Sequence, residues 1–245
     1  MPKWSMVIDL DKCVACQGCS IACRMENNTP AVPPDQAAMG REIRWNDVFP
    51  TPPNQAEQGE YPHVKTYFMT RPCMQCENPP CIKVCPVQAT WKGEEGVVHQ
   101  NYSRCIGCRF CTVACPYGVR YFNWYKPEWD STMREHLNPD RIEGGDFIME
   151  RTEGPIPRPM GVVEKCTFCV QRHEKAVQRA ADEGRELRDS DYVPACVQTC
   201  TGKARYFGDL DNSESTVSLL AGDRRAFTLL EEVGTHPKVI YLMEG

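Results

Sequence analysis

Sixteen cysteines stand in four groups along a chain of 245 residues, and thiols at this density can bind metal. Two groups share the spacing C-x2-C-x2-C-x3-C, one reads C-x2-C-x4-C-x3-C, and the fourth is split by a long insertion. Gaps of two residues let successive sulfurs point at one centre, so each group predicts a metal site. The groups are Cys13, Cys16, Cys19 and Cys23; Cys73, Cys76, Cys81 and Cys85; Cys105, Cys108, Cys111 and Cys115; and Cys166, Cys169, Cys196 and Cys200.

The close third cysteine and the final gap of three residues favour iron–sulfur chemistry. In two-cluster ferredoxins the run C-x2-C-x2-C-x3-C-P sends its fourth cysteine to the other cluster, because that residue lies on a turn facing away. Group three matches this run as far as Pro116, whereas group one has Arg24 at the proline position. Four groups of four use every thiol, so we predict four [4Fe–4S] clusters.

Structural zinc and disulfides are the alternative uses of so many cysteines. Zinc ribbons use two separated C-x2-C pairs without a close third cysteine, which three groups here possess. Disulfide scaffolds are typical of short secreted chains. The first residues, MPKWSMVIDLDKC, show neither an apolar signal region nor a twin-arginine pair. Spacing and compartment therefore both favour iron–sulfur clusters.

Composition narrows the class of partner. A net charge of −5 argues against a nucleic-acid-binding surface, which would be basic. No stretch approaches 18 consecutive apolar residues, so we expect no direct membrane span. Every cysteine is committed to a cluster and no acid/base constellation stands out, so we expect a non-catalytic protein.

Short strands and helices are expected to position the cysteines. Strands are predicted just before the groups, and short helices over the third and fourth cysteines. Apolar spacing predicts a packing helix over 217–233, and a charged helix is expected over 171–188. Residues 24–72 hold eight prolines and are expected to wrap the surface. The expected strands cover 6–10, 63–69, 97–99 and 162–163.

With these groups in place, the chain resembles the four-cluster iron–sulfur subunits of molybdopterin oxidoreductases, such as dimethyl sulfoxide, polysulfide, thiosulfate, tetrathionate and arsenate reductases and sulfite dehydrogenase. The matching strings are MVIDLDKCVACQGCSIAC, RPCMQCENPPCIKVCP, CIGCRFCTVACPYGVRYFNW and GVVEKCTFCVQR. The resemblance implies an α+β fold of two pseudo-twofold-related bacterial ferredoxin-like modules, one inserted into the other, with long surface loops.

The resemblance also divides the chain and pairs its groups. Groups one and four would share a module formed by 1–24 and 160–210, and groups two and three a module formed by 63–125. Surface insertions would cover 25–62 and 126–159, and a C-terminal packing or docking helix and tail would cover 211–245. The implied ligand sets are Cys13, Cys16, Cys19 and Cys200; Cys166, Cys169, Cys196 and Cys23; Cys73, Cys76, Cys81 and Cys115; and Cys105, Cys108, Cys111 and Cys85.

The implied function is electron relay between two partner subunits. One partner would be a molybdopterin-containing catalytic subunit near the Cys13 cluster, and the other an integral membrane quinone-handling subunit near the Cys105 cluster. The chain would be peripheral on a membrane complex, with the cytoplasmic face favoured and co-export to the periplasm with a signal-bearing partner left open. A free-standing soluble polyferredoxin carrier is the alternative, although the long insertions argue against it.

Residues between the ligands supply weaker predictions. Basic side chains beside cysteines could favour the reduced, more negative cluster, or could simply be surface charges. The aromatic run after Pro116 could dock the membrane subunit or be buried packing. The basic residues are Lys12, Arg104, Arg109 and Lys165, and the aromatic ones are Tyr117, Tyr121, Phe122, Trp124 and Tyr125.

Overall fold

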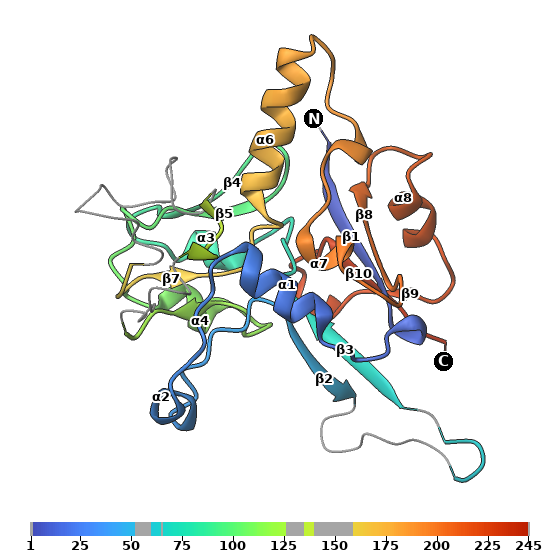
Figure 1. The fold of residues 1–245 in the computed structure, drawn as a ribbon, viewed down its shortest axis with the longest axis horizontal. Coiled ribbons are helices and arrows are strands. Elements are labelled where there is room, and N and C mark those ends of the chain that lie inside the picture. The colour runs from blue at the N-terminus through green and yellow to red at the C-terminus, as the bar shows by residue number, and fades with distance from the viewer. Residues whose placement is uncertain (1, 52–59, 65, 126–134, 140–158, 245) are drawn as a thin grey trace.

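Small sheets and short helices make up the computed structural model, which describes residues 2–51, 60–64, 66–125, 135–139 and 159–244 (Figure 1). Most of the insertion expected at 126–159 therefore lies outside the described residues, as do residues 52–59 of the earlier insertion.

A four-stranded sheet in the order β8-β1-β10-β9 forms the largest regular element. Strand β1 (Trp4–Asp9) pairs antiparallel with β8 (Arg205–Asp209) and parallel with β10 (Val239–Leu242), which pairs with β9 (Ala226–Phe227). All six residues of β1 are buried. Such a strand is covered on both faces, which explains the unbroken apolar stretch Met6–Ile8 within it.

The helix predicted over 217–233 is wrong in extent. Helix α8 covers only Thr216–Ala221, because Gly222 ends it as the C-cap residue and a turn follows. The chain then forms β9, a 3-10 turn at Glu231–Val233 and β10, so the C-terminal tail supplies a central strand. The apolar residues of 217–233 are thus spread over α8, β9 and the turn that follows, and do not form one face of a single helix.

Helices that carry cysteines pack in two pairs. Helix α1 (Gly18–Glu26) contacts α7 (Ala195–Gln198), and α3 (Pro80–Lys83) contacts α4 (Phe110–Ala114). The first pair joins groups one and four, and the second joins groups two and three. We call these the first half and the second half of the molecule. Their relation as ferredoxin-like modules stays a prediction.

Three two-stranded ribbons complete the strands among the described residues. The ribbon of β4 and β5 lies between groups two and three, and that of β2 and β3 lies between groups one and two. The third ribbon joins β6, which follows group three, to β7, which precedes group four. The expected strands at 63–69, 97–99 and 162–163 are confirmed with shifts of one to four residues. The ribbons are β2 (Asp47–Thr51) with β3 (Tyr67–Arg71), β4 (Thr90–Lys92) with β5 (Val98–Gln100), and β6 (Tyr121–Phe122) with β7 (Val163–Glu164).

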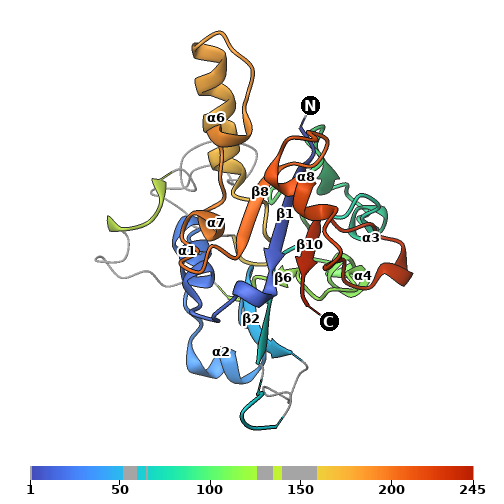
Figure 2. The ribbon, with the colours of Figure 1, turned by 90° about the vertical axis from the view of Figure 1, so that its right-hand side faces the viewer.

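Two helices stand apart from the cysteine-bearing pairs. Helix α6 (Val170–Asp182) extends away from the sheet and is shorter than the expected 171–188 (Figures 1 and 2). Helix α2 (Pro34–Ala38) has no buried residue, as expected for a Pro-rich surface segment. The same segment nevertheless sends Ile43 and Trp45 into the core.

Thiols are part of the hydrophobic core rather than an addition to it. The largest core cluster contains Trp4, Met6 and Ile8 of β1. Its buried residues also include cysteines of groups one, two and four. Burial of free thiols among apolar side chains is normal for cysteine. The fold therefore brings the chemistry-bearing residues to the centre of the molecule.

Candidate metal centres

Two hollows are each lined by four thiols from two different groups. One is lined by Cys13, Cys16 and Cys19 of group one with Cys200 of group four. The other is lined by three cysteines of group two, Cys73, Cys76 and Cys81, with Cys115 of group three. In both, the fourth thiol comes from the partner group, as the exchange rule of two-cluster ferredoxins predicts. We call the set around Cys13 the first outer set, because it belongs to the first half and reaches the surface. We call the set around Cys73 the second inner set, because it belongs to the second half and has no exposed thiol.

A third set of thiols is buried on all sides. Cys23 interacts electrostatically with Cys166, Cys169 and Cys196, and burial raises its pKa well above the usual value. Asn27 lies between two members, with Nδ2 3.6 Å from Cys23 Sγ and 3.9 Å from Cys169 Sγ. These four thiols form the first inner set.

The fourth set is as open to the surface as the first outer set. Cys111 and Cys105 pack in one core cluster and interact electrostatically. Cys108 is exposed and Cys85 is half-buried. The family resemblance implies that Cys85 and Cys108 belong with Cys105 and Cys111. These four form the second outer set.

Exposure separates the outer sets from the inner sets. Of the sixteen cysteines, all of which lie in described residues, only Cys16 and Cys108 are exposed. They hold the same place, the second cysteine, in groups one and three. Each half of the molecule therefore has one thiol set that reaches the surface and one that does not.

Left-handed backbone shapes the cysteine loops. Gln17 and Arg109 both have φ near +60° and stand at the N-caps of α1 and α4, between the second and third cysteines of their groups. Turns of this kind point successive N–H groups into a concavity, an arrangement that recurs at iron–sulfur sites. The equivalent geometry in two groups follows from their equal spacing.

Backbone N–H groups also reach individual thiols. The N–H of Ala89 lies 3.2 Å from Cys85 Sγ, and that of Ala204 lies 3.3 Å from Cys200 Sγ. Each donor is four residues after its cysteine. Hydrogen bonds to a ligand sulfur are one of the means by which a protein sets the potential of a cluster.

Burial makes these thiols poor thiolates without a cation. The pKa of both Cys76 and Cys166 is raised to about 12, mainly because burial removes the thiol from water. A bound metal reverses this, because metal ligation requires the deprotonated sulfur. The donor set therefore fits a positively charged group held between four thiols.

The arrangement suits a polynuclear cluster better than a single ion. Within the described part of the chain, no three His, Cys, Asp or Glu side chains are grouped to hold one metal ion. A zinc ion would need four ligands at about 2.0–2.3 Å from one point. Four thiols around a hollow instead suit the wider frame of an iron–sulfur cube.

Two buried arginines beside the thiols were not predicted from the sequence. Arg120 and Arg205 are each 5% exposed and interact electrostatically with cysteines of their own half. Both stand five residues after the last cysteine of a group, Cys115 or Cys200. The repeated spacing C-x4-R is the signal that could have identified them.

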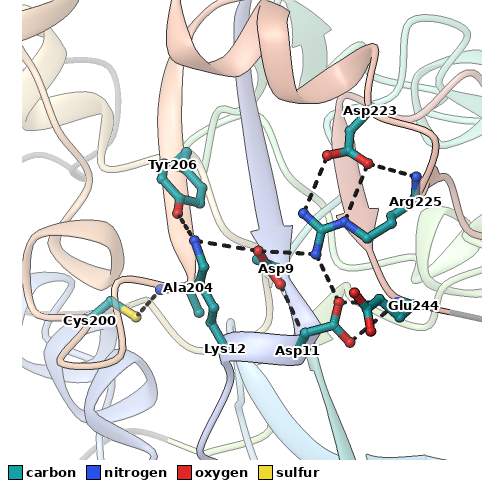
Figure 3. Close-up of polar contacts among 9 residues, drawn as sticks. All are labelled: Asp9, Asp11, Lys12, Cys200, Ala204, Tyr206, Asp223, Arg225 and Glu244. Carbon is teal, nitrogen blue, oxygen red and sulfur yellow. Dashed lines mark hydrogen bonds and ion pairs between the residues drawn. The ribbon is translucent and has the colours of Figure 1, made fainter.

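The basic residues predicted to act on the clusters lie in different settings. Lys12 is 52% exposed on its side chain and is held by Asp9 at 3.6 Å and by the Tyr206 hydroxyl at 2.7 Å (Figure 3). Arg104 and Arg109 are also exposed. Lys165 is fully buried, and its Nζ donates to the carbonyl of Cys166 at 2.8 Å.

Figure 3 shows why the charge of Lys12 is compensated. Asp9 is buried and also lies 3.7 Å from Arg225, which is bound in turn by Asp11 at 2.9 Å. This network links the start of group one to the C-terminal segment around Asp223. It connects the first cysteine loop with that segment and leaves little unpaired charge there.

Exposed apolar side chains surround both outer sets. Val14 (67% exposed) and Ile21 stand beside the first outer set, and Ile106 and Val113 (82%) stand beside the second. They occupy matching places, one residue after the first cysteine and two after the third. Apolar groups at the surface in matching positions are typical of interaction sites.

The aromatic run after Pro116 serves mostly as packing. Tyr117 is buried and its hydroxyl bonds the carbonyl of Leu229 at 3.3 Å. Tyr121, Phe122 and Tyr125 are half-buried. Trp124 is exposed, with the guanidinium groups of Arg41 and Arg109 over its ring at 4.6 and 4.7 Å.

Within the described residues, no helix has the length and apolar character needed to cross a membrane.

Comparisons with known proteins agree with the chemistry of the thiols. Residues 64–142 match the family model of the 4Fe-4S dicluster domain, which contains groups two and three. The chain is 45% identical to the iron–sulfur cluster-binding subunit of menaquinone reductase from Nitratidesulfovibrio vulgaris, covering 98% of this chain and 88% of the relative. It is 40% identical to a selenate reductase subunit from Mesobacillus selenatarsenatis, over 98% and 72%. It is 35% identical to the iron–sulfur subunit of arsenate respiratory reductase from a Shewanella species, over 98% and 96%.

Proposed function

The chain belongs to the family of iron–sulfur electron-transfer subunits of molybdopterin-type reductases, and we propose that it relays electrons through four [4Fe–4S] clusters between a catalytic and a membrane subunit. The observation that carries the proposal is the sorting of sixteen thiols into four sets, of which two reach the surface. A relay needs a buried middle and two exposed ends, and this chain supplies both.

All sixteen cysteines serve as ligands in this proposal. The hollows of the first outer and second inner sets support the partition, as do the electrostatic contacts of Cys23. A cluster supplies a centre that takes up and releases one electron. The proposed sets are Cys13, Cys16, Cys19 and Cys200; Cys23, Cys166, Cys169 and Cys196; Cys73, Cys76, Cys81 and Cys115; and Cys85, Cys105, Cys108 and Cys111.

The chain's own residues insulate the middle of this relay. The first inner set is enclosed by core side chains, and Phe168 beside it has no exposed surface. The exposed thiols Cys16 and Cys108 mark where electrons enter and leave. A partner that docks on the apolar side chains around these thiols excludes water and brings its own redox centre close to the cluster.

We assign the two ends to different partners. The end at Cys16 meets the molybdopterin-containing catalytic subunit, and the end at Cys108 meets the membrane quinone-handling subunit. Relatives named for menaquinone, selenate and arsenate reductases support a role in such assemblies. The chain is then peripheral on a membrane complex, and we favour its cytoplasmic face.

Charge substitutions at the two rims test the assignment. In the affinity-tagged chain expressed with its neighbouring subunits, Ile21→Glu should reduce co-purification of the catalytic subunit only. Val113→Glu should reduce co-purification of the membrane subunit only. Leu219→Glu is the matched control, because Leu219 on α8 has an exposure between those of Ile21 and Val113. This variant should retain both partner subunits. If both variants keep both partners, or the chain purifies alone as a carrier, the proposal is wrong.

A further inference from the structure

Two buried guanidinium groups occupy equivalent places in the two halves of the molecule. Arg205 stands five residues after Cys200, and Arg120 stands five residues after Cys115. Each is 5% exposed, which is unusual for arginine unless it is paired. The partners of each side chain therefore decide what its charge does.

Arg205 lies in a cradle of neutral groups in the first half. Its Nη2 donates to Asn46 Oδ1 at 2.7 Å and to the Thr70 hydroxyl, and Nη1 lies 3.6 Å from Met6 Sδ. None of these partners carries a negative charge.

Arg205 lines the same hollow as the four thiols of the first outer set, and it interacts with thiols of both sets in its half. Cys196 of the first inner set interacts with it most strongly. Cys19 and Cys200 of the first outer set interact with it as well. The guanidinium therefore lies between the two sets of the first half.

Arg120 repeats this arrangement in the second half. Its Nη2 donates to the Thr90 hydroxyl at 2.9 Å and to Gln100 Oε1, both of them neutral. Its Nε and Nη1 are buried and have no oxygen acceptor among the described residues, whereas the thiols of Cys81 and Cys111 lie within hydrogen-bonding reach of the side chain. Buried polar groups nearly always have a partner, so a further group belongs beside this guanidinium.

The surroundings of Arg120 identify that further group. Its electrostatic partners are Cys81 and Cys73 of the second inner set and Cys111 of the second outer set. No carboxylate within the described residues forms an ion pair with Arg120 or Arg205, whereas the exposed Lys12 has Asp9. The groups that interact with the charge of Arg120 are thus thiols, and those that interact with Arg205 are thiols and the Tyr241 hydroxyl.

We propose that Arg120 and Arg205 each hold one uncompensated positive charge between the two clusters of a half and raise the reduction potentials of both. The inference rests on the four-cluster function proposed above. Reduction adds negative charge to a cluster, so a nearby buried cation stabilises the reduced form. Burial maximises the effect, because water screens the charge of exposed residues such as Lys12 or Arg104.

Redox titration of the anaerobically purified complex, followed by electron paramagnetic resonance, tests this role. In Arg205→Met, the clusters of the first half should be at least about tenfold harder to reduce at equilibrium, which is about 59 mV for one electron. Those of the second half should keep their potentials. Arg120→Met should show the reverse pattern.

Matched variants separate charge from structure. Lys12→Met and Arg104→Met remove exposed charges beside cysteines and should leave every potential unchanged. Arg205→Lys and Arg120→Lys keep the charge and should retain most of the parent potentials, even where a Met variant loses clusters. Unchanged potentials in Met variants that hold their full iron would overturn the inference, as would Lys variants with lowered potentials. A parent protein with fewer than four clusters would instead refute the proposed function.

Discussion

The two halves of the molecule carry the same thiol chemistry on different supports. The first half rests on the four-stranded sheet, where Trp4, Met6 and Ile8 of β1 build a large core. The second half shares that large core through residues such as Met74 and Val97. Its own additions are ribbons of two or three residue pairs and a small cluster around Cys81 and Cys111, with Val98 and Val163.

This difference indicates how each half is held together. A large apolar core can stabilise a fold without metal, whereas a small cluster in which half of the buried residues are ligands depends more on the metal for its stability. Two-stranded ribbons are marginal in water without further packing. We therefore expect the first half to tolerate the loss of a cluster better than the second.

The largest expected effect concerns the third cysteines of groups one and two, which have similar burial. Cys81→Ser should lose both clusters of the second half, about half of the iron, because Cys81 is part of its small core. Cys19→Ser should lose a single cluster, about a quarter of the iron, because the sheet holds the rest. Iron and acid-labile sulfide per chain measure the difference. Equal losses in the two variants would contradict the contrast between the halves.

Tryptophan truncations compare the two cores directly. Trp4 is fully buried and packs against Tyr192 and Phe207, so Trp4→Ala should cost about 3–5 kcal/mol. Trp91 on β4 is half-buried and stacks on His99, so Trp91→Ala should cost roughly 1–2 kcal/mol. Guanidinium titration followed by visible absorbance provides the comparison. A larger cost for Trp91 would show that the ribbons, and not the sheet, limit stability.

A buried carboxylate lies where segments of the two halves meet. Glu164 on β7 accepts hydrogen bonds from Trp45 Nε1 and Asn123 Nδ2, both at 3.1 Å. Glu164→Gln offers one oxygen where two are used, so we expect a loss of about 1–3 kcal/mol. The control Glu214→Gln, at an exposed site, should change stability by less than about 0.5 kcal/mol. If the two variants are equally stable, Glu164 does not join the halves.

The smallest effects are expected for exposed basic residues beside the cysteines. Lys12→Gln in the first half and Arg104→Gln in the second should each change stability by less than about 1 kcal/mol, because exposed ion pairs contribute little. Thermal midpoints of the two variants should therefore match that of the parent. A large loss in either would show that surface charge supports the cysteine loops.

Local covalent spacing made the thiol sets predictable. Gaps of two and three residues constrain where each sulfur can point, so the spacing predicts that the fourth ligand is exchanged, while the family resemblance implies which groups exchange it. The strand expected over 6–10 was also predictable and is present as β1, although Leu10 lies in the 3-10 turn Leu10–Lys12 that follows it. These features depend only on neighbours in the sequence.

Features that depend on distant neighbours were missed. Strand β10 lies beside β1 although more than 230 residues separate them, and the short run Val239–Leu242 carries no sign of that pairing. Arg120 and Arg205 look like surface charges in the sequence. Their burial follows from acceptors such as Thr70 and Gln100, which only the fold brings near.

Native mass spectrometry of the anaerobically purified chain tests the central claim most directly. We expect a dominant species whose added mass equals four [4Fe–4S] clusters, and a loss of one cluster at a time as collision energy rises. A species with two clusters, with one [3Fe–4S] cluster among four, or with zinc in place of iron would contradict a relay of four [4Fe–4S] clusters.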